Sequence, residues 1–142
     1  MDRLILEEKL EALRHCVVRV EQRRTHSADE LRSDPDRQDI LTLNLTRAVQ
    51  LCVDMATHII AESEEPAPQT MGEAFDALAH LGVIAPSLAA RMKSAVGFRN
   101  IAVHNYQTID WDIVFAITHE GLGVFQEFAA AVDRIVDRGG SR

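Results

Sequence analysis

Apolar residues recur at spacings of three and four along most of the chain, which is the pattern of amphipathic helices. Residues 3–24 carry a first stripe, and residues 37–63 carry a second, wider one. The first stripe consists of Leu6, Leu10, Leu13, Val17 and Val20. Between the two stripes, Ser27 is placed to cap a short turn and Pro35 to end it. The first half of the chain therefore predicts two long helices joined by a short turn.

The second half of the chain predicts three further helices. Thr70 and Glu73 have the spacing of a capping box, which opens one helix, and Gly82 is placed to end it. Another helix spans residues 88–105, and a fifth runs from about 110 to 138, with a bend expected at its glycines. No segment shows convincing alternation of period two, so we expect no sheet. The prediction is an all-α, up-and-down bundle of about five helices.

The length of 142 residues fits one domain, expected to span residues 1–138 with 139–142 as a flexible tail. The apolar runs are too short for a transmembrane segment. Acidic residues near the N-terminus interrupt the apolar stretch that a signal peptide needs, so we expect a cytoplasmic protein with no membrane partner. The net charge of −7 argues against a broad nucleic-acid surface. A role with RNA or DNA then needs a local basic patch or a brief enzymatic encounter.

Cysteine usage predicts neither a metal site nor a redox site. Cys16 and Cys52 each lie among aliphatic residues, and their spacing matches no metal or redox motif. Free cysteines usually behave as small hydrophobic residues, so we expect two buried, unreactive thiols. We expect no cofactor and no metal.

Four side chains that can bind a ligand or transfer a proton lie within residues 99–106: Arg99, Asn100, His104 and Tyr106. Asn100 and His104 share a helical face, so the amide can bond one imidazole nitrogen and leave the other free to move a proton. Arg99 lies about 140° round the helix from His104. The two side chains therefore converge only on a ligand beyond the helix surface, and a second copy from another subunit completes the site more easily.

An imidazole beside a guanidinium suits metal-free cleavage of RNA. The imidazole of His104 can take a proton from the ribose 2′-hydroxyl, and Arg99 can stabilise the charge on the phosphorane. The same residues could instead cap the carbonyls of a helix end, where cations are favoured. For so short a motif, spacing alone favours capping.

The segment resembles the signature of the HEPN superfamily, and specifically its HepT-like branch: Arg99, four residues, His104, one residue, Tyr106. The flanking segments also resemble this branch, and so do the two long N-terminal helices, so the resemblance covers nearly the whole chain. The segments that carry it are Val96-Gly97-Phe98-Arg99-Asn100, Tyr106-Gln107-Thr108-Ile109-Asp110 and, in the second helix, residues 47–60. One departure is Asn105, where the family often has glycine, but asparagine tolerates a left-handed backbone at a helix end.

The resemblance implies a specific biology. HepT-like proteins are all-helical homodimers whose two motifs line one cleft, and they act as metal-independent endoribonuclease toxins of type II- or VII-like toxin–antitoxin pairs. Carried over by position, Arg99 and His104 would be catalytic on an RNA substrate, and Asn100 would support them. Tyr106 matches the tyrosine that an MntA-like minimal nucleotidyltransferase antitoxin modifies with AMP.

Two alternatives stay open on the sequence. Related HEPN domains resemble non-catalytic companions of nucleotidyltransferases that bind a nucleotide or substrate. The net negative charge of this chain suits such a companion. The intact Arg–His–Tyr set suits it less well. The second alternative is a helical adaptor without a site, in which changes at residues 99–106 would alter stability alone.

Other polar and aromatic residues have mainly structural interpretations. Asp54 and His58, four apart on the second long helix, could pair and act near the cleft, although such pairs are usually structural. Trp111 and nearby phenylalanines could stack on bases, but aromatic residues at helical spacing are more often core. A basic cluster could guide RNA, although a solvated helix end is the simpler interpretation. Its members are Arg19, Arg23, Arg24 and His26.

Overall fold

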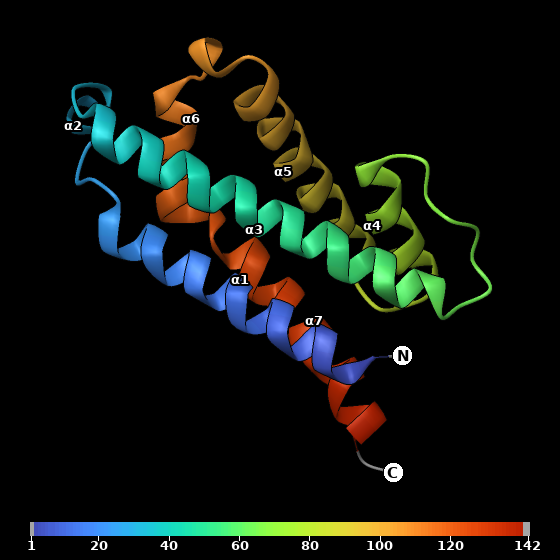
Figure 1. Cartoon of the computed structure of the whole chain (residues 1–142). Coiled ribbons are helices and arrows are strands. Elements are labelled where there is room, and N and C mark those ends of the chain that lie inside the picture. The colour runs from blue at the N-terminus through green and yellow to red at the C-terminus, as the bar shows by residue number, and fades with distance from the viewer. Residues whose placement is uncertain (1, 141–142) are drawn as a thin grey trace.

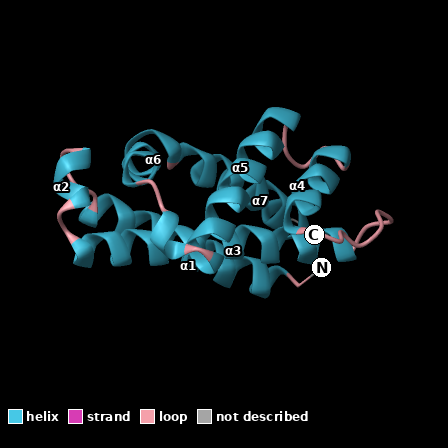
Figure 2. Cartoon of the chain, turned by 90° about the horizontal axis from the view of Figure 1, so that it is seen from above, coloured by secondary structure: helices cyan, strands magenta, loops and turns pink. Residues whose placement is uncertain are grey.

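A computed structural model describes residues 2–140 of the chain, with side chains described for residues 2–138. The described part is all-helical, as predicted, and no strand occurs in it (Figure 2). Helices α1 and α3 lie side by side and antiparallel, with α7 behind α1 and with α4 and α5 on the other side of α3 (Figure 1). The bounds are α1 (Arg3–Arg23), α2 (Ala28–Arg32), α3 (Pro35–Ala61), α4 (Met71–His80), α5 (Pro86–His104), α6 (Trp111–Ala116) and α7 (Gly123–Gly140), with a 3₁₀ turn η1 (Tyr106–Thr108) and a π-helical turn η2 (Ile117–Gly121).

The apolar stripes predicted from the sequence form the core. All five residues of the first stripe are buried, and they meet the buried residues of α3 and α7. Phe75 of α4 and Phe128 of α7 pack edge to face, with ring centroids 5.7 Å apart. Cys16 and Cys52 are free and buried, as expected, and burial raises the pKa of both thiols. These thiols are therefore poor nucleophiles at neutral pH.

Side-chain caps fix several helix starts. Half of the predicted capping box is present: the Glu73 backbone N–H donates to Thr70 Oγ1 at 3.1 Å. The Glu73 side chain accepts instead from the N–H of Gln69, one residue before the N-cap, with Oε2 at 2.8 Å. Just beyond the end of this helix, Gly82 adopts φ 75°, a left-handed conformation that glycine accepts without strain. The spacing of Thr70 and Glu73 thus predicted the start of α4, and Gly82 predicted its end.

Pro35 begins the long helix α3 instead of ending the turn before it, so that prediction was wrong. Asp34 accepts the Arg37 backbone N–H at 3.1 Å and caps the helix. Proline fits the first helical position because its missing N–H has no partner there anyway. The preceding turn forms a short helix of its own, α2, which Ser27 caps.

The predicted fifth helix is divided into α6, η2 and α7, close to the glycines at which a bend was expected. Thr118, the second residue of η2, is buried, and its Oγ1 donates to the Phe115 carbonyl at 2.8 Å. The Thr118 carbonyl accepts from Arg24 Nη1 at 3.0 Å. Polar groups inserted into a helical ladder interrupt it, and π-helical turns are one result. With α2, this division brings the described part to seven α-helices instead of about five.

Helix α7 continues to Gly140, into the first two residues of the tail predicted at 139–142, while residues 141 and 142 lie outside the described residues. The longest loop, residues 62–70, extends beyond the bundle beside α4 (Figure 2). Within the described residues, no helix combines the length and apolar character needed to cross a membrane.

Candidate active site

The segment 99–106 lies where α5 ends. Helix α5 stops at His104, and the backbone then turns through Asn105 into η1, so Tyr106 leaves the helical path as expected. Asn105 has φ −151° and ψ 54°. Its φ is negative, so the left-handed backbone considered for this position is not used. This end of the molecule, α5 and η1, projects at the top of Figure 1.

The three motif residues on α5, Arg99, Asn100 and His104, are arranged differently from the prediction. Arg99 Nη1 donates to Asn100 Oδ1 at 3.1 Å, whereas His104 is exposed and has no hydrogen-bond partner among the described residues. The expected bond between Asn100 and His104 is not formed. A guanidinium makes a stronger, charge-assisted bond to an amide oxygen than a neutral imidazole does. Asn100 therefore orients Arg99 and leaves both imidazole nitrogens of His104 open to a ligand.

An apolar surface borders these polar groups. Ile101 of α5 is 47% exposed, and Ile113 of α6 is 55% exposed. Val103 is 52% exposed, but it lies about 200° round α5 from Ile101 and so faces another side. Ile101 and Ile113 also line a hollow of about 650 Å³ between α5, α6 and α7. Phe98 and Phe125 are among its other lining residues. Exposed apolar side chains that gather in one place commonly mark an interface. The end of α5 thus combines free polar groups with an apolar surface that a protein partner could bury.

Tyr106 is held by groups on two other helices. Its hydroxyl donates to Asp39 Oδ1 of α3 at 2.5 Å, and its ring meets Trp111 edge-on with centroids 5.9 Å apart. Burial and the hydrogen bond to Asp39 raise the pKa of Tyr106 to about 12, while the hydroxyl of Thr42 acts in the opposite direction. The side chain is still 37% exposed. The phenol is therefore both reachable and protonated at neutral pH.

Asp39 and Thr42 were not identified from the sequence. They lie three positions apart on one face of α3, and Thr42 is buried although it is polar. Thr42 Oγ1 has no hydrogen bond of good geometry within the described residues, yet it lies close enough to Tyr106 to influence its pKa. A polar residue inside the wide apolar stripe of α3 was the one available signal.

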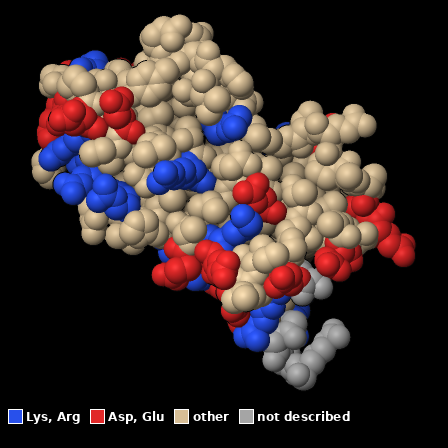
Figure 3. Space-filling view, in the orientation of Figure 1, with Lys and Arg blue, Asp and Glu red and all other residues tan. Residues whose placement is uncertain are grey.

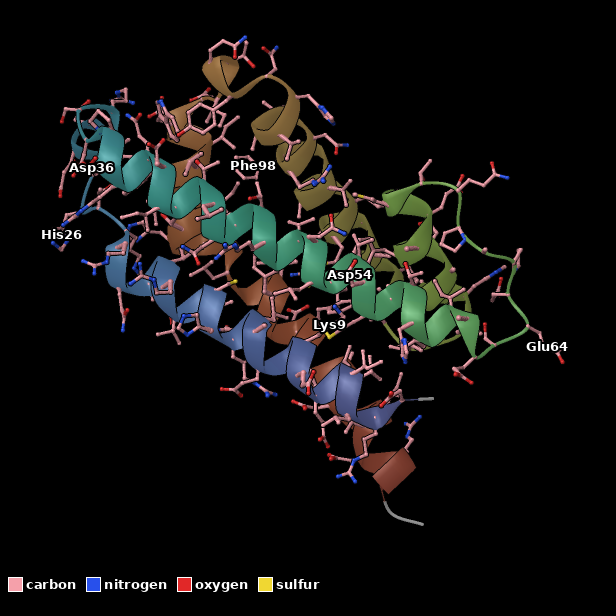
Figure 4. The ribbon with its side chains drawn as sticks, viewed as in Figure 1. Lys9, His26, Asp36, Asp54, Glu64 and Phe98 are labelled. Carbon is pink, nitrogen blue, oxygen red and sulfur yellow. The ribbon has the colours of Figure 1, made fainter. Side chains whose placement is uncertain are left out.

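Asp54 and His58 do not pair with each other, and in one chain they lie far from Tyr106. Asp54 accepts from Gln50 Nε2 at 2.9 Å and meets Lys9 Nζ of α1 at 3.5 Å (Figure 4). His58 Nε2 is buried and has no partner within the described residues. Asp54 is about 22 Å further along α3 than Asp39. Its contacts join α1 to α3.

Charged side chains of both signs lie in clusters on the left and lower parts of the visible face, and Lys and Arg gather at the end where α1 leads into α2 (Figure 3). Part of this basic cluster is structural, because Arg24 bonds the Thr118 carbonyl. His119 Nε2 lies 2.7 Å from the Thr25 carbonyl and ties the same loop to η2. Within the described residues, no three His, Cys, Asp or Glu side chains gather as a metal site.

Comparison with known proteins gives consistent relatives. The family model described as "Ribonuclease HepT-like" matches residues 8–132. The chain is 33% identical over 124 residues to the "mRNA nuclease HepT" of Shewanella oneidensis, covering 87% of this chain and 92% of that one. It is 29% identical over 112 residues to the "tRNA nuclease HepT" of Aphanizomenon flos-aquae, covering 79% and 76%.

A solved structure shares the whole fold. It is the "tri-AMPylated Shewanella oneidensis HEPN toxin in complex with MNT antitoxin", which is 32% identical and has a TM-score of 0.85. The similarity covers 92% of this chain and 97% of that one.

Proposed function

The chain belongs to the HepT-like ribonuclease family, and from that premise we propose that it is a metal-independent endoribonuclease, the toxin of a toxin–antitoxin pair. The relatives named above are nucleases of mRNA and of tRNA, and one is described as a toxin bound to its antitoxin. RNA is accordingly the proposed substrate of this chain. A minimal nucleotidyltransferase of the MntA type is the proposed partner.

The observation that carries the proposal is the free imidazole of His104 at the same helix end as the guanidinium of Arg99, which Asn100 orients. An imidazole can take the proton of a ribose 2′-hydroxyl near neutral pH. A guanidinium offers paired donors to the phosphate as negative charge builds on it. Arg99 and His104 are therefore assigned catalytic roles, with Asn100 in support.

The catalytic cleft is proposed to form between two copies of the chain. Within one helix, Arg99 and His104 diverge by about 140°, so one copy presents an incomplete site. Ile101 and Ile113 leave apolar surface uncovered beside the motif. A second copy that covers this surface would bring two motifs together, so that Arg99 and His104 could act on one phosphate from different subunits.

Silencing of the nuclease by its partner is proposed to occur at Tyr106, where the nucleotidyltransferase would transfer AMP from ATP to the tyrosine. The AMPylated state of the Shewanella toxin supports this step. Tyr106 is partly exposed and follows His104 by two residues. A phosphodiester there would place negative charge and bulk beside the catalytic groups, which would repel RNA and obstruct the cleft.

The test of the nuclease is cleavage of labelled single-stranded RNA in EDTA. Wild type should cleave, while His104→Ala and Arg99→Ala should each lose about 10²-fold or more in rate. His80→Ala is the matched control, because His80 is an exposed histidine on α4. Equal cleavage by wild type and His104→Ala would remove His104 from the mechanism.

A second candidate is a non-catalytic nucleotide- or substrate-binding companion of a nucleotidyltransferase, which the net charge of −7 favours. Expression in growing cells separates the two. A toxin stops growth, and His104→Ala relieves the arrest, whereas a companion has neither effect. Intact mass after co-expression with a neighbouring nucleotidyltransferase tests silencing, since AMP-sized additions should disappear in Tyr106→Phe.

A further inference from the structure

The contact between Asp39 and Tyr106 joins residues that are 67 positions apart, one on α3 and one on η1. Asp39 is exposed, and within the described residues its carboxylate makes this hydrogen bond and no ion pair. Many carboxylates nearby have other roles. Asp34 and Asp110 cap helices, and Asp112 pairs with Arg32. Asp39 is thus free to change its protonation state without breaking a cap or a salt bridge.

A tyrosine hydroxyl must lose its proton to become a phosphate ester. With a pKa of about 12, about one Tyr106 in 10⁵ would be ionised at neutral pH. The environment of this phenol therefore opposes spontaneous ionisation, and rapid esterification needs a group that accepts the proton as the new bond forms. The carboxylate oxygen 2.5 Å from the hydroxyl already accepts its hydrogen bond.

We propose that Asp39 accepts the proton of Tyr106 when the tyrosine receives AMP. This inference rests on the proposed silencing at Tyr106 and adds a catalytic residue supplied by the toxin itself. Tyr106 Oη attacks the α-phosphorus of ATP, which the nucleotidyltransferase holds. The Oη–P bond forms, and the bond from that phosphorus to the bridging oxygen breaks. Pyrophosphate leaves with the electron pair, and the phenol proton moves to Asp39 Oδ1.

Two neighbours prepare the hydroxyl for this step. Thr42 lies one turn along α3 from Asp39 and is 4% exposed. Its hydroxyl lowers the pKa of Tyr106, so it favours the phenolate that develops as the proton leaves. The edge-on contact with Trp111 restricts the ring. The Tyr106 hydroxyl thus has one hydrogen-bonded proton acceptor, Asp39, while Thr42 favours its ionised form and Trp111 contacts its ring.

A purely structural bond is the competing interpretation, and two substitutions separate it from proton transfer. Asp39→Asn keeps an oxygen that can accept the hydrogen bond but removes the basic carboxylate. Asp39→Glu keeps a carboxylate on a longer side chain. If Asp39 only fastens η1 to α3, the asparagine variant should react like wild type. If it accepts the proton, the glutamate variant should react faster than the asparagine variant.

The experiment follows the first AMP addition by intact mass, with purified MntA-like nucleotidyltransferase and ATP in excess, from pH 6 to pH 10. Asp39→Asn should slow the addition by about 10²-fold at pH 7. Its rate should rise with pH more steeply than that of wild type, because hydroxide must then remove the proton. Asp36→Asn is the control, since it removes an exposed carboxylate three residues earlier on α3 (Figure 4).

The outcomes separate this inference from the proposed function. Equal rates for wild type and Asp39→Asn, with AMP still lost in Tyr106→Phe, overturn the role of Asp39 and leave silencing intact. No AMP on wild type overturns both. A poorly folded Asp39→Asn would show altered Trp111 fluorescence, and Asp39→Glu then decides: recovery of less than a tenth of the wild-type rate in a folded variant also overturns the role.

Discussion

At the scale of single residues, the chain contains one tyrosine and one tryptophan, and these two rings meet. Absorbance of tyrosinate therefore reports Tyr106 alone, and Trp111 fluorescence reports its surroundings. Because the folded pKa of about 12 exceeds the ordinary value of 10.0, the neutral phenol favours the folded state. That contribution to stability is complete below pH 10 and is lost as the pH rises from about 10 to about 12.

The first prediction concerns this titration. Wild type should form tyrosinate with a midpoint near pH 12, and Asp39→Asn should lower the midpoint toward 10, because the negative carboxylate no longer opposes ionisation. Burial should keep it from reaching the ordinary value. Asp36→Asn should titrate like wild type. A wild-type midpoint close to 10 would mean that the hydroxyl is not held as described.

Residue chemistry was predictable from the sequence where it depends on neighbours along the chain. The resemblance of Arg99, His104 and Tyr106 to a family signature gave the candidate site, which spacing alone did not, and its position at a helix end was correct. The predicted hydrogen-bond partner of Asn100, His104, was wrong. Asn100 bonds Arg99 instead, and the choice between these two partners depends on side-chain geometry. Asp39 could not be assigned, since nothing along the chain links it to Tyr106.

At the scale of elements, the π-helical turn η2 is hydrogen-bonded to residues that follow the C-terminal end of α1. Arg24 donates to the Thr118 carbonyl, and His119 approaches the Thr25 carbonyl, so the loop after α1 is tied to the segment between α6 and α7. Periodicity identified the apolar stripe on both sides of this turn. It could not identify the interruption, although the glycines predicted a bend close to it, and it could not identify the contact between Arg24 and Thr118, which are 94 positions apart.

The second prediction tests that tie. Arg24→Ala should lower the free energy of unfolding by about 1 kcal/mol, because the charged donor of a partly buried hydrogen bond is lost. Arg23→Ala is the control, since Arg23 is exposed at the end of α1. Urea unfolding at neutral pH measures both. Equal losses in the two variants would mean that Arg24 does not hold η2.

At the scale of the whole molecule, the fold was predictable because its contacts follow from helical stripes joined by short loops. Homodimerisation remains a prediction, and it concerns the apolar surface around Ile101 and Ile113. A chain with a net charge of −7 repels RNA at long range, so a nuclease of this composition needs its positive groups concentrated in one cleft. Pairing two copies of Arg99 would do this.

The third prediction addresses the dimer directly. Ile101→Asp should give a monomer by light scattering, because a carboxylate would be desolvated at the interface, and cleavage of RNA should be lost with it. Leu4→Asp is the control: Leu4 is 62% exposed at the start of α1. A stable dimer of Ile101→Asp that still cleaves RNA would place the interface elsewhere.

The hydrogen bond that spans 67 positions has a consequence for when silencing can begin. During synthesis Asp39 emerges long before Tyr106, and the two meet only after α3 and α5 have docked. An unfolded or partly synthesised chain therefore presents Tyr106 without the carboxylate of Asp39 beside it. If Asp39 accepts the proton as proposed, the nucleotidyltransferase would add AMP faster to folded chains than to unfolded ones.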